Sequence, residues 1–149
     1  MPPPFTIRIM IWRDALPHAR PVRERVFIDE QAVPRELEWV EWDEASDHAV
    51  ALDASGGAIG TARLLPDGRI GRMAVIKAWR GKGVGAALLA AMLVRARSRG
   101  MPRALLHAQI QAAGFYRKFG FSERGGAFLE AGIPHVEMTL DLSPGSGGN

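Results

Sequence analysis

The chain has 149 residues, a length typical of one domain that buries roughly 70% of the surface of its unfolded form. It contains no cysteine, which excludes disulfides, thiolate catalysis and a cysteine-ligated zinc site, and its four histidines lack the helical spacing of metal ligands. A net charge of +3, without a run of Lys and Arg interleaved with aromatics, argues against nucleic-acid binding, and no apolar stretch approaches the ~20 residues that cross a bilayer.

The first part of the chain predicts a strand and then a helix. Residues 5–12 alternate between apolar and polar side chains, which is typical of a half-buried strand. Asp14 can cap a helix, but Pro17 and Pro21 each remove a backbone donor, so we expect regular helical hydrogen bonding over about 21–31. The acidic segment 32–47 predicts a loop or a short helix.

Three apolar runs separated by turn residues follow, and they predict three consecutive antiparallel strands at 48–53, 58–65 and 69–76. The pattern then becomes helical over 84–99, where leucines and methionine share one face. Gly100, followed by Met101 and Pro102, ends this helix.

The last part of the chain predicts a strand, a helix and a hairpin. Short apolar runs indicate strands at 104–107, 121–124 and 135–142, with a helix over 111–119 after the first of them. The Gly- and Ser-rich residues 143–149 are expected to form a disordered tail, which leaves a single domain over 1–142.

The run Arg-Gly-Lys-Gly-Val-Gly, from Arg80 to Gly85, lies between a predicted strand and the long helix. Glycines that open a helix leave its first N–H groups accessible where the helix dipole is positive, so the run predicts an anion site. A tight strand-to-helix turn with surface basic residues would have the same pattern. The triphosphate loop G-x-x-x-x-G-K-[ST] is absent, and the dinucleotide fingerprint fails because no acid lies between Asp67 and Glu123.

The run does fit Arg-x-x-Gly-x-Gly, which resembles the acetyl-CoA pyrophosphate loop of the GNAT-type N-acetyltransferases. Two more motifs of that family occur in the same order, namely Arg72-Met73-Ala74-Val75 and Gln109-x-x-Ala112-x-x-x-Tyr116-x-x-x-Gly120-Phe121. The strings at 26–31 and 128–135 are similar to the ElaA-like branch of the family. The resemblance covers about residues 5 to 141, with Gln109 standing where many relatives carry Asn.

The resemblance implies an α/β (α+β) fold of GNAT type, with a mixed, mostly antiparallel central sheet and helices on both faces. Two central strands, at about 70–76 and 103–108, would splay apart to form the cleft for the co-substrate acetyl-CoA. The first strand would hold the pantetheine arm and the loop would hold the pyrophosphate. The implied cofactor-binding residues are Met73, Ala74, Val75, Arg80, Gly81, Lys82, Gly83, Val84, Gly85 and Gln109.

Acetylation of an amine needs a base that takes a proton from the amine and an acid that protonates the departing thiolate. Tyr116, the only tyrosine, stands at the family's motif position and is the candidate acid; its other interpretation is an anchor for its helix. Glu30 is the leading candidate for the base or for an anchor of the substrate amine, with a solvated helix glutamate as the other interpretation. His135, His107 and water are alternative bases.

Charge is unevenly distributed along the chain. Of the 16 acidic residues, 11 lie between Asp14 and Asp53, whereas 11 of the 19 basic residues lie between Arg69 and Lys118. The basic half suits the phosphates of coenzyme A, and the acidic half would suit a cationic amine. Ordinary solvated helix faces would give the same distribution.

The sequence therefore predicts an acetyl-CoA-dependent N-acetyltransferase that transfers the acetyl group directly to a primary amine of a small molecule or peptide, because no cysteine can form an acyl-enzyme. A non-catalytic acyl-CoA-binding sensor or interaction module is the alternative, and nucleic-acid binding is a distant third. Neither the acceptor nor a preference for another acyl-CoA can be read from the sequence. The start of the chain lacks the segments of a secretion signal, so we expect a cytoplasmic protein with no metal and no membrane partner, and a homodimer is compatible with the sequence.

Overall fold

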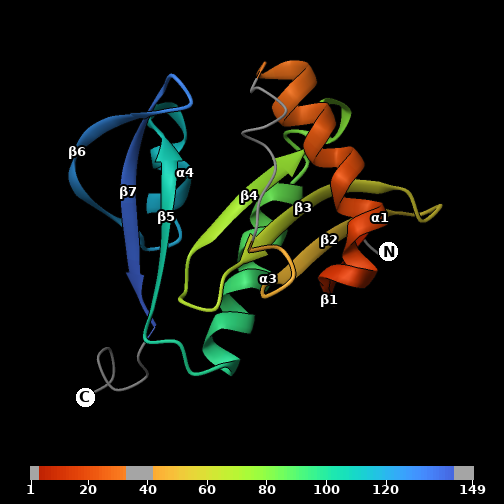
Figure 1. Ribbon diagram of the computed structural model, residues 1–149, viewed down its shortest axis with the longest axis horizontal. Coiled ribbons are helices and arrows are strands. Elements are labelled where there is room, and N and C mark those ends of the chain that lie inside the picture. The colour runs from red at the N-terminus through yellow and green to blue at the C-terminus, as the bar shows by residue number, and fades with distance from the viewer. Residues whose placement is uncertain (1–3, 33–41, 143–149) are drawn as a thin grey trace.

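A computed structural model of the chain describes residues 4–32 and 42–142. The predicted disordered tail at 143–149 and most of the predicted loop at 32–47 lie outside the described residues. Two β-sheets with helices packed on them form the described part (Figure 1).

The first sheet has four strands in the order β1-β2-β3-β4, all antiparallel. It confirms the first strand and the three consecutive strands predicted after it. The strands are β1 (Phe5–Ile11), β2 (Asp47–Asp53), β3 (Ala58–Leu64) and β4 (Ile70–Val75).

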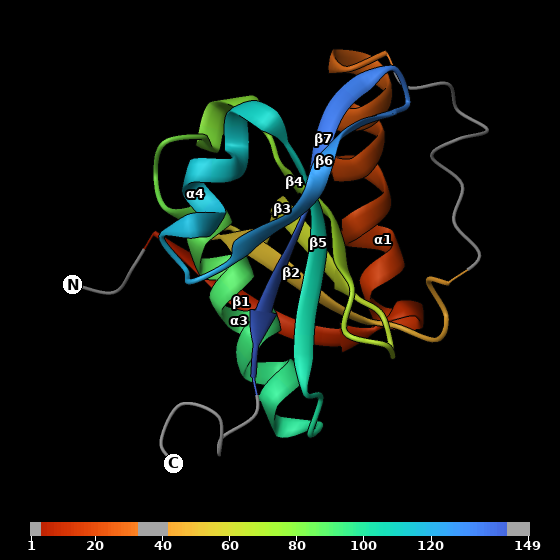
Figure 2. The ribbon, with the colours of Figure 1, turned by 90° about the vertical axis from the view of Figure 1, so that its left-hand side faces the viewer.

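The second sheet has three antiparallel strands in the order β5-β7-β6, and Figure 2 shows it facing the viewer. They are β5 (Arg103–Gln109), β6 (Ser122–Glu130) and β7 (Ile133–Asp141). The predicted hairpin is confirmed, but β6 extends beyond residue 124 and leaves a turn at Ala131 and Gly132, where φ is 52° and 78°. Between Arg124 and Phe128 the strand contains two glycines and a register shift, so its side chains do not alternate between apolar and polar there. The alternation pattern therefore did not predict that β6 continues.

In the described part of the chain, one backbone bridge joins the two sheets. A parallel bridge joins Arg69 to Leu105, and the Leu105 N–H donates to the Gly68 carbonyl at 3.1 Å. Gly68 has φ of 97°, and a Cβ there would lie 2.3 Å from the Arg103 carbonyl oxygen, so this approach requires glycine. From this vertex β4 and β5 diverge toward their C-terminal ends, which confirms the expected splayed pair (Figure 1).

Helix α1 (Trp12–Arg23) lies on one face of the first sheet and begins at Trp12, so the prediction that helical bonding starts at residue 21 was wrong. Ala15, Ala19 and Val22 form a buried stripe, and their packing offsets the backbone hydrogen bonds that the two prolines cannot make. The helix continues into the π-helical segment η1 (Glu24–Glu30), which ends with a bond from the Gln31 N–H to the Val26 carbonyl at 3.1 Å.

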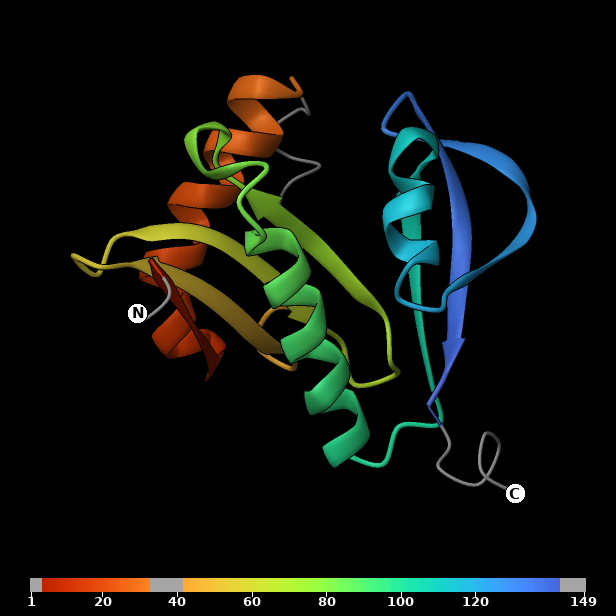
Figure 3. The ribbon, with the colours of Figure 1, turned by 180° about the vertical axis from the view of Figure 1, so that it is seen from behind.

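Helix α3 (Val84–Ser98) covers the opposite face, as Figure 3 shows, and confirms the predicted long helix. Its buried residues, including Leu88, Leu89 and Met92, pack in one core with residues of both sheets. The predicted helix at 111–119 is shorter, a turn of 3-10 helix, η3 (Ile110–Ala112), followed by α4 (Ala113–Arg117). Another 3-10 turn, η2 (Lys77–Trp79), follows β4.

Candidate active site

A cleft of about 660 Å³ opens between β4 and β5, where the two strands diverge. Side chains from β4, from β5 and from the turn between β6 and β7 line it, together with two residues from the end of the first helical segment. The lining includes Phe27, Gln31, Arg63, Arg69, Arg72, Met73, His107, Gln109, Tyr116, Glu130 and His135.

Strand β4 carries a β-bulge where it borders the cleft. Arg63 pairs with Gly71 and Thr61 pairs with Ala74, so Arg72 and Met73 stand opposite one residue of β3. Arg72 adopts a positive φ of 49°, which is uncommon for a residue other than glycine and is typical of functional sites. Of the three β4 residues predicted to contact the cofactor, Met73 lines the cleft, Ala74 is buried and Val75 is half-buried.

The start of α3 has the features of an anion site. Gly81 and Gly83 have φ of 77° and 88°, and a Cβ built on either meets no atom within 4 Å, so the backbone here is open to a ligand. Gly83 is the N-cap, and no side chain caps the helix. The N–H groups of the first turn, from Val84 onward, are therefore accessible to an anion.

Arg80, at the start of this loop, is already bonded within the protein. Its Nε donates to the Val75 carbonyl at 2.9 Å, and its Nη2 donates to Glu30 Oε1 at 2.6 Å. The hydrogen bond from Arg80 holds the pKa of the Glu30 carboxyl below its ordinary value. Lys82 lies over the Trp79 ring, 5.9 Å from its centroid. Two predicted site residues, Glu30 and Arg80, are thus brought together, but neither lines the cleft.

Tyr116 lines the cleft from α4. Its ring packs edge-on against Phe115 and Phe121, at 5.0 and 6.1 Å between centroids. Burial raises the pKa of the Tyr116 phenol, so it is protonated at neutral pH. Gln109, at the end of β5, also lines the cleft and accepts a hydrogen bond from Gln111 Nε2 at 2.7 Å.

Two histidines and a glutamate lie together on the wall formed by the second sheet. His135 Nδ1 is 2.6 Å from the Ile133 carbonyl, which can only accept, so the proton is on Nδ1 and the Nε2 lone pair is free when the ring is neutral. His107 Nδ1 bonds Glu130 Oε1 at 2.8 Å, while Glu130 Oε2 lies 3.8 Å from His135 Nε2. The Phe128 ring contacts both imidazoles.

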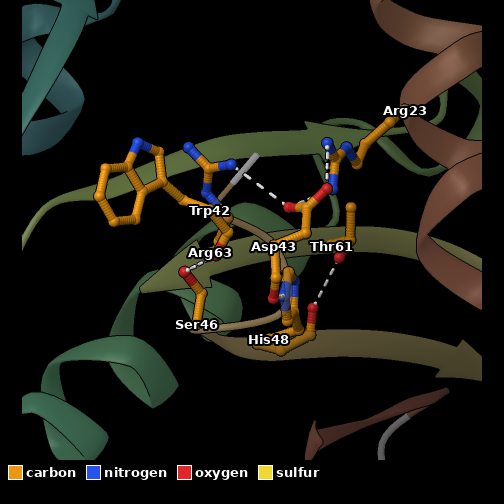
Figure 4. A network of polar contacts seen from close by, with 8 residues as sticks. Arg23, Trp42, Asp43, Ser46, His48, Thr61 and Arg63 are labelled. Carbon is orange, nitrogen blue, oxygen red and sulfur yellow. Dashed lines mark hydrogen bonds and ion pairs between the residues drawn. The ribbon is translucent and has the colours of Figure 1, made fainter. Parts of the chain in front are cut away.

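A buried network that the sequence did not reveal lies between α1 and the first sheet (Figure 4). Arg23 binds both carboxylate oxygens of Asp43, at 3.1 and 3.2 Å, and Arg63 Nη1 binds Oδ1 of the same residue at 3.2 Å. His48 Nε2 donates to the Asp43 carbonyl at 2.9 Å, and burial lowers the pKa of this imidazole. These residues come from α1, a turn and two strands, and no local sequence pattern joins them.

Comparisons with known proteins agree with this geometry. A family model described as an acetyltransferase (GNAT) domain matches residues 15–142. An uncharacterized N-acetyltransferase of Bacillus subtilis, YjcF, is 40% identical over 126 residues, which are 80% of this chain and 88% of that protein.

Two solved structures have the same fold at similar length. An acyl-CoA N-acyltransferase from Pseudomonas aeruginosa matches with a TM-score of 0.82 and 27% identity over 91% of this chain and 98% of its own. ElaA of Escherichia coli matches with a TM-score of 0.82 and 25% identity over 91% of this chain and 99% of its own. Within residues 4–32 and 42–142, no helix is long and apolar enough to cross a membrane, and no group of three or more His, Asp or Glu could hold a metal ion.

Proposed function

Because the chain belongs to the GNAT acetyltransferase family, whose members are acyltransferases that use an acyl-CoA as co-substrate, we propose that it transfers an acetyl group from acetyl-CoA directly to a primary amine. The observation that supports this most is the continuity of the open glycine loop at the start of α3 with the bulged strand β4 beside the cleft. The acceptor would be a small molecule or a peptide that carries the amine.

The residues present fit a CoA thioester. The pyrophosphate would bind the first N–H groups of α3, with Gly81 and Gly83 giving it room and Arg80 and Lys82 supplying charge. The pantetheine arm would lie along the bulge at Met73. Since Arg80 has donors beyond the two it uses, its guanidinium can reach a phosphate while it stays bonded to the Val75 carbonyl.

The transfer forms a C–N bond and breaks the C–S bond of the thioester. We propose His135 as the base, because it lines the cleft and the lone pair of its Nε2 could take a proton from the attacking amine. Tyr116 would donate its phenolic proton to the departing thiolate, and its raised pKa keeps that proton available. Glu30, the other predicted base, is bonded to Arg80 and in this proposal holds that side chain in place.

Release of the CoA thiol tests the proposed function. Purified protein mixed with acetyl-CoA and a panel of amines, amino acids, polyamines and peptides should release thiol only when an acceptor is present, and mass spectrometry should find the acetylated amine. Tight CoA binding without thiol release across the panel would instead favour the non-catalytic sensor.

Tyr116→Phe tests the role of the phenol. The substitution keeps the ring that packs on Phe115 and Phe121 and removes only the hydroxyl, so the fold and the affinity for CoA should stay unchanged. General-acid assistance is worth about 10²- to 10⁴-fold in rate, and we expect kcat to fall by about 10²-fold because a CoA thiolate is already a fair leaving group. A kcat within about threefold of the parent, with chemistry limiting the rate, would make Tyr116 a packing residue.

A further inference from the structure

The turn between β6 and β7 brings a glutamate into the wall of the cleft. Ala131 and Gly132 have φ of 52° and 78°, so two residues with positive φ join the strands, as in the two-residue turns that hairpins favour. Glu130 and Ile133 flank this turn, pair with each other and both line the cleft. A short turn fixes the register of the two strands, so the backbone of Glu130 has a fixed position relative to His135.

The two oxygens of the Glu130 carboxylate have different surroundings. A carboxylate only accepts hydrogen bonds, so His107 Nδ1 donates to Glu130 Oε1, at 2.8 Å. The other oxygen, Oε2, lies 3.8 Å from His135 Nε2, which is too far for a direct hydrogen bond. His107 therefore holds one oxygen in place, and the second oxygen stands near the nitrogen proposed above as the base.

Glu130 Oε2 and His135 Nε2 are both hydrogen-bond acceptors when the imidazole is neutral. The proton on His135 Nδ1 is bonded to the Ile133 carbonyl, which leaves the lone pair on Nε2. Two acceptors cannot bond to each other, but one nitrogen that carries several N–H groups can bond to both. Hydrogen bonds of about 2.9 Å reach two atoms that are 3.8 Å apart. The pair therefore fits a group with at least two N–H donors, as a protonated primary amine has.

We propose that Glu130 binds the acceptor as an ammonium ion, and that His107 positions the Glu130 carboxylate for this role. The proposal rests on the proposed acetyl transfer, because it places the acceptor nitrogen beside His135 in the cleft. Glu130 thereby takes the role of amine anchor that the sequence suggested for Glu30, which is bonded to Arg80 and does not line the cleft.

The chemistry of an amine agrees with this arrangement. An aliphatic primary amine resembles the lysine side chain, with its pKa of about 10.4, and is protonated at neutral pH. The carboxylate of Glu130 attracts the ammonium and accepts one of its N–H groups in a charge-assisted hydrogen bond. Another proton passes from the nitrogen to His135 Nε2. This transfer leaves a neutral amine, whose lone pair can attack the thioester carbon, and an imidazolium close to the carboxylate.

Pairs of ligands that differ in a single group test the binding of the ammonium. Butylamine is compared with 1-butanol, and phenethylamine with 2-phenylethanol, so that only the amine is replaced by a neutral hydroxyl. Calorimetry in the presence of saturating CoA measures their dissociation constants without turnover. We expect each amine to bind at least about tenfold more tightly than its alcohol, the effect of one charge-assisted hydrogen bond.

Glu130→Met should remove this preference, so that amine and alcohol differ in affinity by less than about threefold, while the affinity for CoA stays unchanged. Methionine keeps the length of the side chain and removes both oxygens, and the variant should fold because Glu130 is half-exposed. Glu123→Gln is the matched control. It removes a carboxylate of the same strand, which pairs with Arg117 outside the cleft, and should keep the preference. Glu130→Gln replaces the methionine variant if that one does not fold, and should also remove the preference.

His107 needs a separate test, because its proposed role is to position the carboxylate. His107→Phe keeps a ring against Phe128 and removes the donor to Glu130 Oε1, so the preference for the amine should fall by about three- to tenfold. His107→Asn loses the ring but can donate through its amide nitrogen, and should retain most of the preference. If the histidine only packed against Phe128, the two variants would have the opposite order.

Kinetics with an acceptor found by thiol release give a second readout. Glu130→Met should raise KM for the amine by at least about tenfold and change kcat less, because the lost interaction is already made in the ground state. Equal affinity for amines and alcohols in the parent protein, or a preference that survives in Glu130→Met, would overturn the proposal while leaving acetyl transfer intact. If no amine releases thiol, the proposed function fails, and calorimetry with the two ligand pairs still decides whether Glu130 binds an ammonium.

Discussion

Two arginine-containing regions of the protein differ in how their charge is held. Arg80 lies in the glycine loop at the start of α3, half exposed, and its ion pair with Glu30 lies at the surface. Arg63 and Arg23 share one carboxylate in the interior. Exposed pairs contribute little to stability because water screens them, whereas removal of one member of a buried pair is costly. The loop is therefore expected to affect ligand binding, and the buried network is expected to affect folding.

The largest effect is expected for Asp43→Asn, which removes the carboxylate that the two buried guanidiniums share. The free energy of unfolding should fall by about 3–5 kcal/mol, the cost of breaking a buried ion pair. Urea denaturation measures it. Asp67→Asn, which removes the exposed partner of Arg69, is the control and should cost about 1 kcal/mol or less. Equal losses of unfolding free energy in the two variants would mean that the buried pair is no more important for stability than the exposed one.

Arg80→Ala should leave the urea midpoint nearly unchanged and weaken CoA binding by about 10- to 100-fold, the range for a charge-assisted hydrogen bond. Isothermal titration calorimetry with CoA measures the dissociation constant. Lys77→Ala is the control, because it removes a positive charge from η2, the turn before the loop. It should weaken CoA binding less than Arg80→Ala does. Unchanged CoA affinity in a folded Arg80→Ala variant would mean that the pyrophosphate binds elsewhere.

The smallest effect concerns pH and His48. Burial lowers the pKa of His48 in the folded protein, so the unfolded chain takes up a proton below pH 6.5 that the folded protein does not. Stability that is fully present above about pH 6.5 is therefore lost as the pH falls from there toward the lowered folded pKa. The loss at pH 5.5 is at most about 1.4 kcal/mol.

Urea midpoints at pH 7.5 and 5.5 measure this difference, and His48→Gln should reduce it. The Gln amide can still donate to the Asp43 carbonyl, so the variant separates the titration from the hydrogen bond. The same pH dependence in both proteins would assign the titration to another group.

Sequence patterns predicted the parts of the molecule that depend on neighbouring residues. The alternation in the first sheet and the helical pattern after Gly83 are local, and the structure confirms both of them. The glycine run does open this helix, but its role as an anion site stays a prediction. The cleft between β4 and β5 was expected from the family resemblance rather than from the residues themselves, and it is present. Roles of individual site residues stay predictions.

Features that depend on distant residues were missed. Arg23 and Arg63 each lie 20 positions from Asp43, so no short motif links them. Helix α1 was predicted to start too late because the cost of Pro17 is visible in the sequence, whereas the packing of its buried stripe on the sheet is not. The pairing of Glu30 with Arg80, 50 positions apart, also depends on tertiary structure alone.

The vertex at Arg69 and Leu105 has a consequence for folding. All strand pairs of the first sheet lie within residues 5–75 and all those of the second within 103–141, so each sheet can form its own ladders, and one bridge and the shared core around α3 join them. The cleft thus lies at the interface between two halves of the protein, each with its own hydrogen-bonded sheet. A ligand that contacts both walls binds only when the halves are joined, so by mass action it stabilises the assembled protein, and saturation with ligand should raise the melting temperature.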